Sequence, residues 1–500
     1  MSIVDLLLLG SYFGLMAVLS LFGLHRYALV YLYYRHRDRA QGPPPRRFER
    51  LPAVTVQLPV FNERFVVADL INSACALRYP RHLLQIQVLD DSTDETSAVL
   101  ERIVGEKRAA GEPIEYIHRS NRAGYKAGAL AAGLRRASGE LIAIFDADFT
   151  PERDFLERLV HYFADPKVGM VQTRWTFRNR NLSLLTQVQA MLLDGHFVFE
   201  HGGRARSGRF FNFNGTAGML RRAMIEDAGG WQYDTLTEDT DLSYRAQLRG
   251  WKFLYASQVQ APSELPAAMA DFQVQQFRWA KGLLQTGLKL LPGLLRSGQP
   301  ARIKLEAAFH LLANIAYPMM LLLAALILPS MLVRHEFLDG RLLWLDLPAF
   351  LLTFCSLSSF YTLSQAELGR GGVHRHLKLV PPLVLAGISL SISNSRAVLG
   401  ALRGSRSAFE RTAKYSGDRN AAALARRAYG RRGGWRVIAN LAAATYFAVC
   451  LGIAVDIEHW LGLPVIALFL AGFSYAGFSM LTDARAADQA VLRTADDSAP

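Results

Sequence analysis

Several acidic residues stand in short motifs that suit a group-transfer reaction. Glu238 and Asp239 are adjacent in TEDTDL, and a carboxylate that accepts a proton from an attacking hydroxyl is half of such a reaction. Asp146 and Asp148 stand in FDADF, directly after an apolar run. Two carboxylates in that position suit Mg²⁺ or Mn²⁺ held together with a substrate diphosphate. Taken singly, each motif also suits the cap of a following helix.

Cationic and aromatic residues accompany these acids. Arg278 and Trp279 stand in QQFRWAKG, where an arginine beside an indole suits a phosphate and a sugar ring. Lys126, in GYKAGAL, adds a positive charge for the phosphates. Each motif has a plainer alternative: an amphipathic helix for QQFRWAKG, an exposed lysine at a helix start for Lys126, and a turn with a cap for DDSTDET at 90–96.

Alternating strand and helix patterns position these residues. Short β-rich runs occur at 53–58, 85–90, 114–118, 141–146 and 168–174, and helical stretches such as 64–77 and 94–110 separate most of them. The alternation predicts an α/β domain with a mostly parallel sheet, and ligands bind such sheets at the carboxyl ends of the strands. Glu63 follows the first run, Asp90 and Asp91 end the second, and FDADF ends the fourth.

Six motifs in order carry a family resemblance. They read DDSTDET, GYKAGAL, FDADF, FNGTAGMLRR, TEDTDL and QQFRW. In this order they resemble the processive, inverting family 2 glycosyltransferases with a GT-A fold, which include cellulose and hyaluronan synthases. NxxGYKAGAL, FNFNGTAG and GWKFL are most similar to the cellulose-synthase-like A group, the glucomannan 4-β-mannosyltransferases. The resemblance covers about residues 54–285 densely and extends loosely to about 415.

The resemblance implies an enzyme and its partners. It implies an inverting hexosyltransferase that moves a sugar from GDP-mannose or UDP-glucose to a growing β-glycan, like mannan, glucomannan or cellulose, and extrudes it through the membrane. It implies Mg²⁺ or Mn²⁺ as cofactor. An alternative with related motifs is a single-addition enzyme that makes a glycolipid, as ceramide or diacylglycerol glucosyltransferases do.

The family's residue roles transfer motif by motif. Asp239 would be the general base, with Glu238 beside it. Asp148, with Asp146, would hold the metal. The donor nucleotide and its diphosphate would be bound by Glu63, Asp90, Asp91, Lys126, Asp146, Gln275, Gln276 and Arg278. The acceptor sugar would lie against Phe213, Asn214, Gly215 and Trp279. The acceptor motif reads NFNGT where cellulose synthases have FFCGS, so it does not define the sugar or the linkage.

The chemistry is also coherent without the family. A leaving diphosphate needs positive charge, which a metal, Lys126 and Arg278 supply. The attacking hydroxyl needs a base on the opposite face, which Asp239 supplies. Direct displacement with no protein nucleophile inverts the anomeric carbon.

Apolar runs at both ends predict a multi-pass membrane protein. Residues 1–34 read as a transmembrane helix, and six arginines against Asp38 and Glu49 between 35 and 50 place the following domain, 50–300, in the cytoplasm. We expect this membrane to be a bacterial inner membrane or a Golgi-like membrane. The C-terminal part, 301–482, reads as spans at about 305–333, 342–363, 437–455 and 461–480, with an interfacial segment at 379–396, a cytoplasmic basic loop at 403–436 and a disordered tail at 483–500.

The basic loop contains a second family pattern. FERTAKYSG resembles the gating-loop pattern FxVTxK of cellulose synthases, and its residues are Phe409, Arg411, Thr412 and Lys414. The alternative is a solvated loop that touches anionic lipid. The net charge of +13 lies mainly beside the spans, which favours lipid and diphosphate over nucleic acid as partners.

Two further classes fit poorly. A transporter or channel would carry charged residues inside its spans, and these spans carry few. The three cysteines have no metal-binding spacing and give no sign of a disulfide framework.

Overall fold

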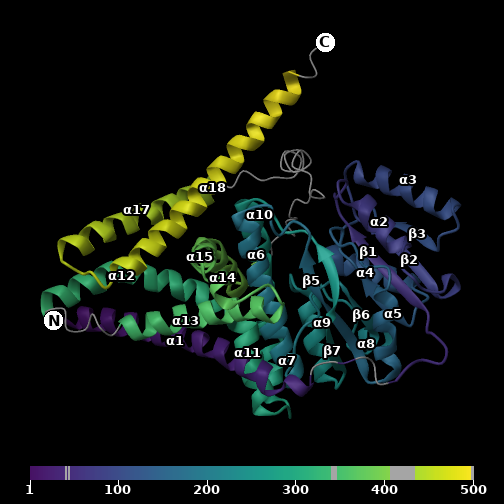
Figure 1. The fold of residues 1–500 in the computed structure, drawn as a ribbon, viewed down its shortest axis with the longest axis horizontal. Coiled ribbons are helices and arrows are strands. Elements are labelled where there is room, and N and C mark those ends of the chain that lie inside the picture. Colours follow the sequence, from purple (N-terminus) through teal and green to yellow (C-terminus); the bar gives the residue numbers. More distant parts are fainter. Residues whose placement is uncertain (40–41, 43–45, 339–345, 406–433, 497–500) are drawn as a thin grey trace.

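The computed structural model describes residues 1–39, 42, 46–338, 346–405 and 434–496. It contains an α/β domain, on the right of Figure 1, beside a group of long helices on the left. The N-terminus lies at the far end of that helical group, so the first helix runs its length before the chain enters the α/β domain (Figure 1).

A mixed sheet forms the centre of the α/β domain. Within the described residues its seven strands have the order β3-β2-β1-β4-β6-β5-β7. They are β1 Val54–Val60, β2 Leu84–Asp90, β3 Ile114–His118, β4 Leu141–Ile144, β5 Val168–Phe177, β6 Gly218–Arg221 and β7 Lys252–Ser263. β6 runs antiparallel to β4 and β5, and the other pairs are parallel. The predicted mostly parallel sheet is confirmed; β6 and β7 were not predicted.

Helices cover both faces of the sheet. Helices α2 Val67–Cys75, α3 Thr96–Ala109 and α5 Phe155–Val160 pack on one face, and α4 Tyr125–Arg136, α8 Arg222–Asp227 and α9 Glu238–Leu248 on the other. Val54, Val56 and Leu58 of β1 point into the first core because alternate strand residues face the same side. On the second face Gly133 of α4 lies directly on Gln57, where a Cβ atom would come within 2.5 Å of Nε2. This close approach fixes α4, whose N-terminal turn carries Lys126.

A layer of helices joins the α/β domain to the long helices. It consists of α6 Leu184–Gly195, the π-helix η4 His196–His201, α7 Gly202–Arg206, α10 Met269–Arg296, α11 Ala301–Leu312 and the 3₁₀ turn η5 Ala313–Ile315. The remaining short elements are η1 Arg37–Arg39, η2 Arg81–Leu83, η3 His161–Ala164 and α14 Val373–Leu377. In Figure 1, α6 and α10 lie between the sheet and the long helices.

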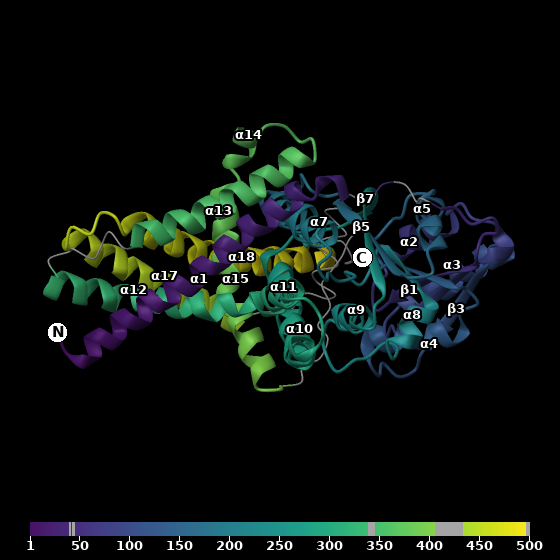
Figure 2. The same ribbon diagram turned by 90° about the horizontal axis from the view of Figure 1, so that it is seen from below.

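The long helices are α1 Ile3–Arg35, α12 Ala316–Leu338, α13 Asp346–Glu367, α15 Val380–Leu402, α17 Gly434–Asp456 and α18 Leu463–Asp496. In the described part of the chain, six helical segments are long and apolar enough to cross a membrane, by length and composition. They indicate an integral membrane protein. α1 and α13 lie side by side, as Figure 2 shows.

Two sequence expectations differ from the structure. The segment 379–396 was expected to be interfacial because only 14 of its residues form an apolar run. From Val380 on it lies within the 23-residue helix α15, and Val373–Leu402 has the length and composition of a span. The tail expected to be disordered from 483 continues as α18 to Asp496, because its alanine-rich sequence favours helix. Phe409, Arg411, Thr412 and Lys414, and most of the basic loop 403–436, lie outside the described residues.

Candidate active site

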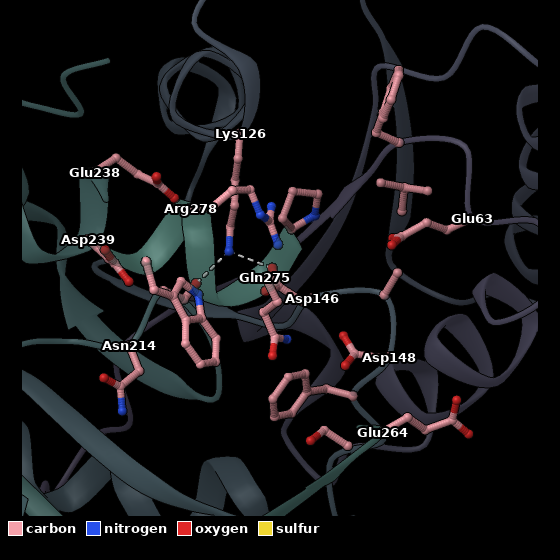
Figure 3. Close-up of a pocket in the computed structure, with 18 of the residues that line it drawn as sticks. Glu63, Lys126, Asp146, Asp148, Asn214, Glu238, Asp239, Glu264, Gln275 and Arg278 are labelled. Carbon is pink, nitrogen blue, oxygen red and sulfur yellow. Dashed lines mark hydrogen bonds and ion pairs between the residues drawn. The ribbon is translucent and has the colours of Figure 1, made fainter. Parts of the chain in front are cut away.

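A cavity of about 180 Å³ opens at the carboxyl ends of β1 and β4. Most of the predicted site residues line it: Glu63, Asp91, Lys126, Asp146, Asp148, Asn214, Gly215, Glu238, Asp239, Gln275, Arg278 and Trp279. They come from strand ends, from the loop before β6, and from α4, α9 and α10, which are far apart in sequence. Figure 3 shows Lys126 extending between the Glu238–Asp239 pair on one side and Asp146 on the other.

Lys126 occupies the first turn of α4 and reaches the middle of the cavity. Gly124 and Tyr125 both have positive φ, +73° and +49°, and this left-handed turn starts the helix. The Nζ of Lys126 donates to Oδ1 of Asp146 at 2.5 Å and to the carbonyl oxygen of Gly215 at 2.9 Å. Burial lowers the pKa of a lysine, but Asp146 and Glu238 outweigh it, so the pKa of Lys126 is raised. A fixed cation at a helix N-terminus is a suitable place for a phosphate.

The residues present fit a divalent metal that is shared with a substrate. Asp148 is almost buried and lines the cavity, and the backbone of Asp146 donates to Oγ1 of Thr216 at 2.9 Å. Among the described residues, no group of three or more His, Cys, Asp or Glu forms a complete metal cage. Mg²⁺ sites of the open kind use one or two carboxylates and take the other ligands from phosphates and water. The Asp146–Asp148 pair has that character.

Glu238 and Asp239 begin α9 and face the cavity from the opposite side. Ser243 Oγ donates to the backbone oxygen of Asp239 at 2.6 Å, and the backbone nitrogen of Thr240 donates to Oδ1 of Asp239 at 2.7 Å. Enclosure by protein, and then the negative charge of Glu238, raise the pKa of Asp239 to about 7. Enclosure also raises the pKa of Glu238. A carboxylate whose pKa lies near neutrality is matched to general base catalysis.

Helix α10 is fastened to the start of α9. A Cβ atom at Gly282 would lie 2.8 Å from the backbone nitrogen of Thr237, so the two chains touch. The backbone nitrogen of Leu236 donates to Oε1 of Gln285 at 3.1 Å, and the hydroxyls of Thr237 and Thr286 are 3.1 Å apart. These contacts place Gln275, Arg278 and Trp279 of α10 over the cavity.

The two carboxylates after β2 have different environments. Asp90 is fully buried and does not line the cavity; it accepts hydrogen bonds from Ser97 Oγ at 2.6 Å and Tyr116 OH at 2.8 Å. Burial would raise its pKa, but bonds from Ser97 and Ser92 outweigh it, so the pKa of Asp90 is lowered. Asp91 lines the cavity and is held by two N–H groups of Arg119. The structure thus separates a buried Asp90 from an accessible Asp91.

Two other predicted residues also lie away from the cavity wall. Phe213 is 1% exposed and its ring packs into the core between the sheet and α4, α8 and α9. Gln276 lies on α10 but does not line the cavity, whereas its neighbour Gln275 does. Phe213 supports the loop of Asn214 and Gly215 from beneath, because its backbone nitrogen donates to Ser243 Oγ at 2.9 Å.

Sequence reasoning missed several lining residues, among them two aromatic rings, an arginine and a glutamate. The guanidinium of Arg122 lies 3.2 Å from the ring centroid of Phe61, and both line the cavity near Asp91. Trp175 and Glu264 line it from the ends of β5 and β7. Phe61 and Arg122 stand in the motifs LPVFNE and NRAGYKAGAL, so their positions in these motifs could have identified them as lining residues. Glu264 follows a strand that the sequence patterns did not reveal.

Comparison with known sequences gives a consistent result. Residues 52–282 match a family model described as "Glycosyltransferase like family 2". Glucomannan 4-beta-mannosyltransferase 2 of Arabidopsis thaliana is 46% identical over 251 residues, which are 49% of this chain and 47% of that protein. Glucomannan 4-beta-mannosyltransferase 1 of Oryza sativa subsp. japonica is 41% identical over 268 residues, 53% of this chain and 51% of that protein. The chain spans about half the length of the curated relatives it matches.

Among solved structures, the chain resembles a mannosyltransferase from Pyrobaculum calidifontis in complex with GDP-Man and Mn²⁺. The identity is 22% and the TM-score 0.48, over 71% of this chain and 98% of that one.

Proposed function

Because residues 52–282 form a domain of the glycosyltransferase-like family 2 on a GT-A fold, we propose that this protein is a membrane-embedded, inverting glycosyltransferase. It moves a hexose from a nucleotide sugar to the end of a growing β-glycan. The observation that carries the proposal is the meeting of a base candidate, Asp239, and a cation, Lys126, beside Gly215. The two halves of a displacement reaction therefore meet in one cavity.

The donor side of the cavity carries the positive charge. Lys126 pairs with Asp146 and Arg278 lines the same cavity, and both would bind the diphosphate, whose negative charge grows as the sugar leaves. Asp148, with Asp146, would hold Mg²⁺ or Mn²⁺, which when bound supplies further positive charge to the leaving group. Asp91, Glu63, Arg122 and Phe61 line the region where the nucleoside would lie.

The acceptor side carries the base. Asp239 would take the proton from the attacking hydroxyl, whose oxygen forms the new bond to the anomeric carbon while the bond to the diphosphate oxygen breaks. A single displacement of this kind converts an α-linked donor into a β-linked product. Glu238 contributes by raising the pKa of Asp239 toward neutrality, which makes the carboxylate a stronger base.

The relatives support a mannosyl donor and a polysaccharide acceptor. The two plant proteins named above are glucomannan mannosyltransferases, so GDP-mannose is the donor we propose and a β-1,4-linked mannan or glucomannan the product. Trp279 lines the cavity and offers a flat apolar face for the acceptor sugar. The catalytic domain lies in the cytoplasm, because six arginines follow α1 between residues 35 and 50.

A product assay tests the proposal. The purified full-length protein in lipid nanodiscs is supplied with Mn²⁺ and radiolabelled GDP-mannose or UDP-glucose, each alone and with an oligosaccharide primer. We expect label from GDP-mannose in a high-mass product that endo-β-1,4-mannanase degrades. If the label partitions wholly into the organic phase, the product is a glycolipid and not a polymer. Hydrolysis of the nucleotide sugar without transfer would overturn the proposal.

A further inference from the structure

A second cavity lies between the α/β domain and the long helices. Its volume is about 260 Å³, and none of its lining residues lines the first cavity. It is bounded by Tyr33 at the end of α1, by Glu367 and Leu368 at the end of α13, and by Arg206 of α7. Arg174 of β5 and Tyr255 of β7 form the wall on the side of the sheet. The cavity therefore sits where two candidate membrane spans meet the α/β domain.

Two arginines bring positive charge to this cavity. Arg174 is 9% exposed, and its Nε donates to the carbonyl oxygen of Ser257 at 3.2 Å. The guanidinium of Arg206 lies 3.6 Å from the ring centroid of Tyr33 and donates to the carbonyl oxygen of Tyr33 at 3.3 Å. In the described part of the chain, neither arginine forms an ion pair with a carboxylate. Arg174 is the buried one of the two; a buried guanidinium without a counter-charge is costly, and a bound anion would offset that cost.

An unpartnered hydroxyl lies in the same cavity. Tyr255 is 4% exposed and lines the cavity, and its OH has no hydrogen-bond partner among the described residues. Its ring is fixed by contacts with Phe197 and His201 at centroid distances of 6.4 and 5.6 Å. A buried hydroxyl that bonds to nothing is unfavourable in a folded protein, so a ligand atom is the natural partner.

One carboxylate lines the same cavity as the two arginines. Glu367 lines the cavity and accepts hydrogen bonds from the OH of Tyr33 at 3.0 Å and of Tyr34 at 2.8 Å. The cavity thus offers a cation and a hydroxyl on the side of the sheet, and a second cation and a fixed anion at the helix ends, both in contact with Tyr33. A ligand with only negative charge would be repelled by Glu367, whereas a ligand with a phosphate and an ammonium group would satisfy both kinds of charge.

We infer that this cavity binds the headgroup of an amine-bearing phospholipid. The phosphate contacts Arg174, Arg206 and the Tyr255 hydroxyl, and the ammonium group contacts Glu367. The location supports a lipid as the source, because Tyr33 and Glu367 end the two candidate spans α1 and α13, which lie side by side (Figure 2). Tyr31 and Tyr34 are exposed near the same end of α1, as tyrosines are at membrane interfaces. This inference is independent of the proposed function.

Native mass spectrometry of the full-length protein tests the inference. The protein is released from nanodiscs that contain equal parts of phosphatidylethanolamine, phosphatidylglycerol and phosphatidylcholine, and retained lipid is identified. We expect one retained phosphatidylethanolamine. Tyr255→Phe should weaken its retention about tenfold, because one hydrogen bond to a charged group is lost. Glu367→Gln keeps one acceptor oxygen, enough for one of the two tyrosines, and should abolish the preference over phosphatidylglycerol because the negative charge is lost.

Stability measurements separate a ligand effect from misfolding. In lipid-free detergent Tyr255→Phe should melt at or above the wild-type temperature, because the lost hydroxyl bonds to no described residue. Tyr79→Phe is the matched control: it removes a buried hydroxyl that donates to Pro52 at 2.6 Å, so it should lower the melting temperature and leave lipid retention unchanged. Equal retention of phosphatidylethanolamine by the wild type and Tyr255→Phe would overturn the inference. Displacement of the lipid by millimolar phosphoethanolamine would show that the cavity binds the free headgroup compound rather than a membrane lipid.

Discussion

Gly215 and Asp239 are in direct contact: a Cβ atom on Gly215 would lie 2.9 Å from Oδ2 of Asp239 and 3.4 Å from Nζ of Lys126. Gly215 has a φ of +79°, in the left-handed region where a side chain is disfavoured. Two physical causes therefore favour glycine at position 215 in FNFNGT. One is the left-handed backbone, and the other is the lack of space for a side chain beside Asp239 and Lys126.

Gly215→Ala should lower kcat/KM by more than about tenfold, because the added methyl group must displace the Asp239 carboxylate. Gly208→Ala is the matched control. Gly208 also has positive φ, +66°, but a Cβ atom there would meet no atom within 4 Å. Both variants should lose similar stability in thermal melts, and only Gly215→Ala should lose activity. Equal activity of the two variants would show that the contact does not matter for the reaction.

Asp239→Asn should reduce kcat by about 10² to 10⁴, the range expected for loss of a general base. Donor binding, measured by calorimetry with GDP and Mn²⁺, should persist because Asp239 faces the acceptor side. Asp234→Asn serves as the control on the same segment, since Asp234 forms an exposed pair with Lys289. Near-normal turnover of Asp239→Asn would remove this residue from the mechanism.

The raised pKa of Asp239 predicts the pH dependence. Activity should rise as pH increases through about 7, because only the deprotonated carboxylate accepts the proton. Glu238→Gln removes a neighbouring negative charge, so the midpoint should move to lower pH by roughly one unit. Glu226→Gln, on the exposed side of α8, should leave the midpoint unchanged. An unshifted midpoint in Glu238→Gln would show that the two carboxylates are not coupled.

The same titration affects stability with a definite sign. The pKa of Asp239 in the folded protein lies above its ordinary value of 3.8, so the folded state binds the proton more tightly than the unfolded state. The contribution of Asp239 to folding is therefore complete below pH 4 and is lost as pH rises through about 7.

Asp148→Ala should lose metal-dependent binding of GDP, because Asp148 and Asp146 are the metal-holding pair that we propose. Titration of GDP with and without Mn²⁺ measures this directly, without activity. Asp154→Ala, an exposed residue just before α5, is the control and should bind as the wild type does. Full activity in excess chelator would contradict the metal assignment.

The sequence predicted which residues line the cavity wherever strand ends define its wall. Asp91, Asp146 and Asp148 each follow a buried strand, and parallel strands bring their carboxyl ends to one edge. The sequence did not show that Asp91 lines the cavity while Asp90 is buried. Side chains point alternately to the two faces of a strand, and the sequence does not show at which residue this alternation ends. Phe213 was misplaced for the same reason: a motif gives the order of residues but not which of them faces the cavity.

Helix α15 shows why its length was underestimated. Pro381 and Pro382 suggested an irregular segment, but they stand in the first turn of the helix, where the missing N–H has no intrahelical partner. Ser393, Asn394 and Ser395 suggested an end, yet all three are buried inside the helical assembly. These polar residues therefore end the apolar run in the sequence, but the helix continues past them to Leu402.

Helix α10 has a consequence for how such proteins can be recombined. Its middle, at Gly282, touches the segment before α9. It also packs on α11, α15 and α18, and Nε2 of Gln273 donates to the carbonyl oxygen of Ser389 of α15 at 3.0 Å. The residues that cover the cavity therefore rest on membrane helices. A chimera that joins the α/β domain of one relative to the membrane helices of another should transfer α10 with the membrane helices and restore Thr237, Gly282 and Gln285 as a set. The set of residues that has to be exchanged together therefore includes parts of both the α/β domain and the long helices.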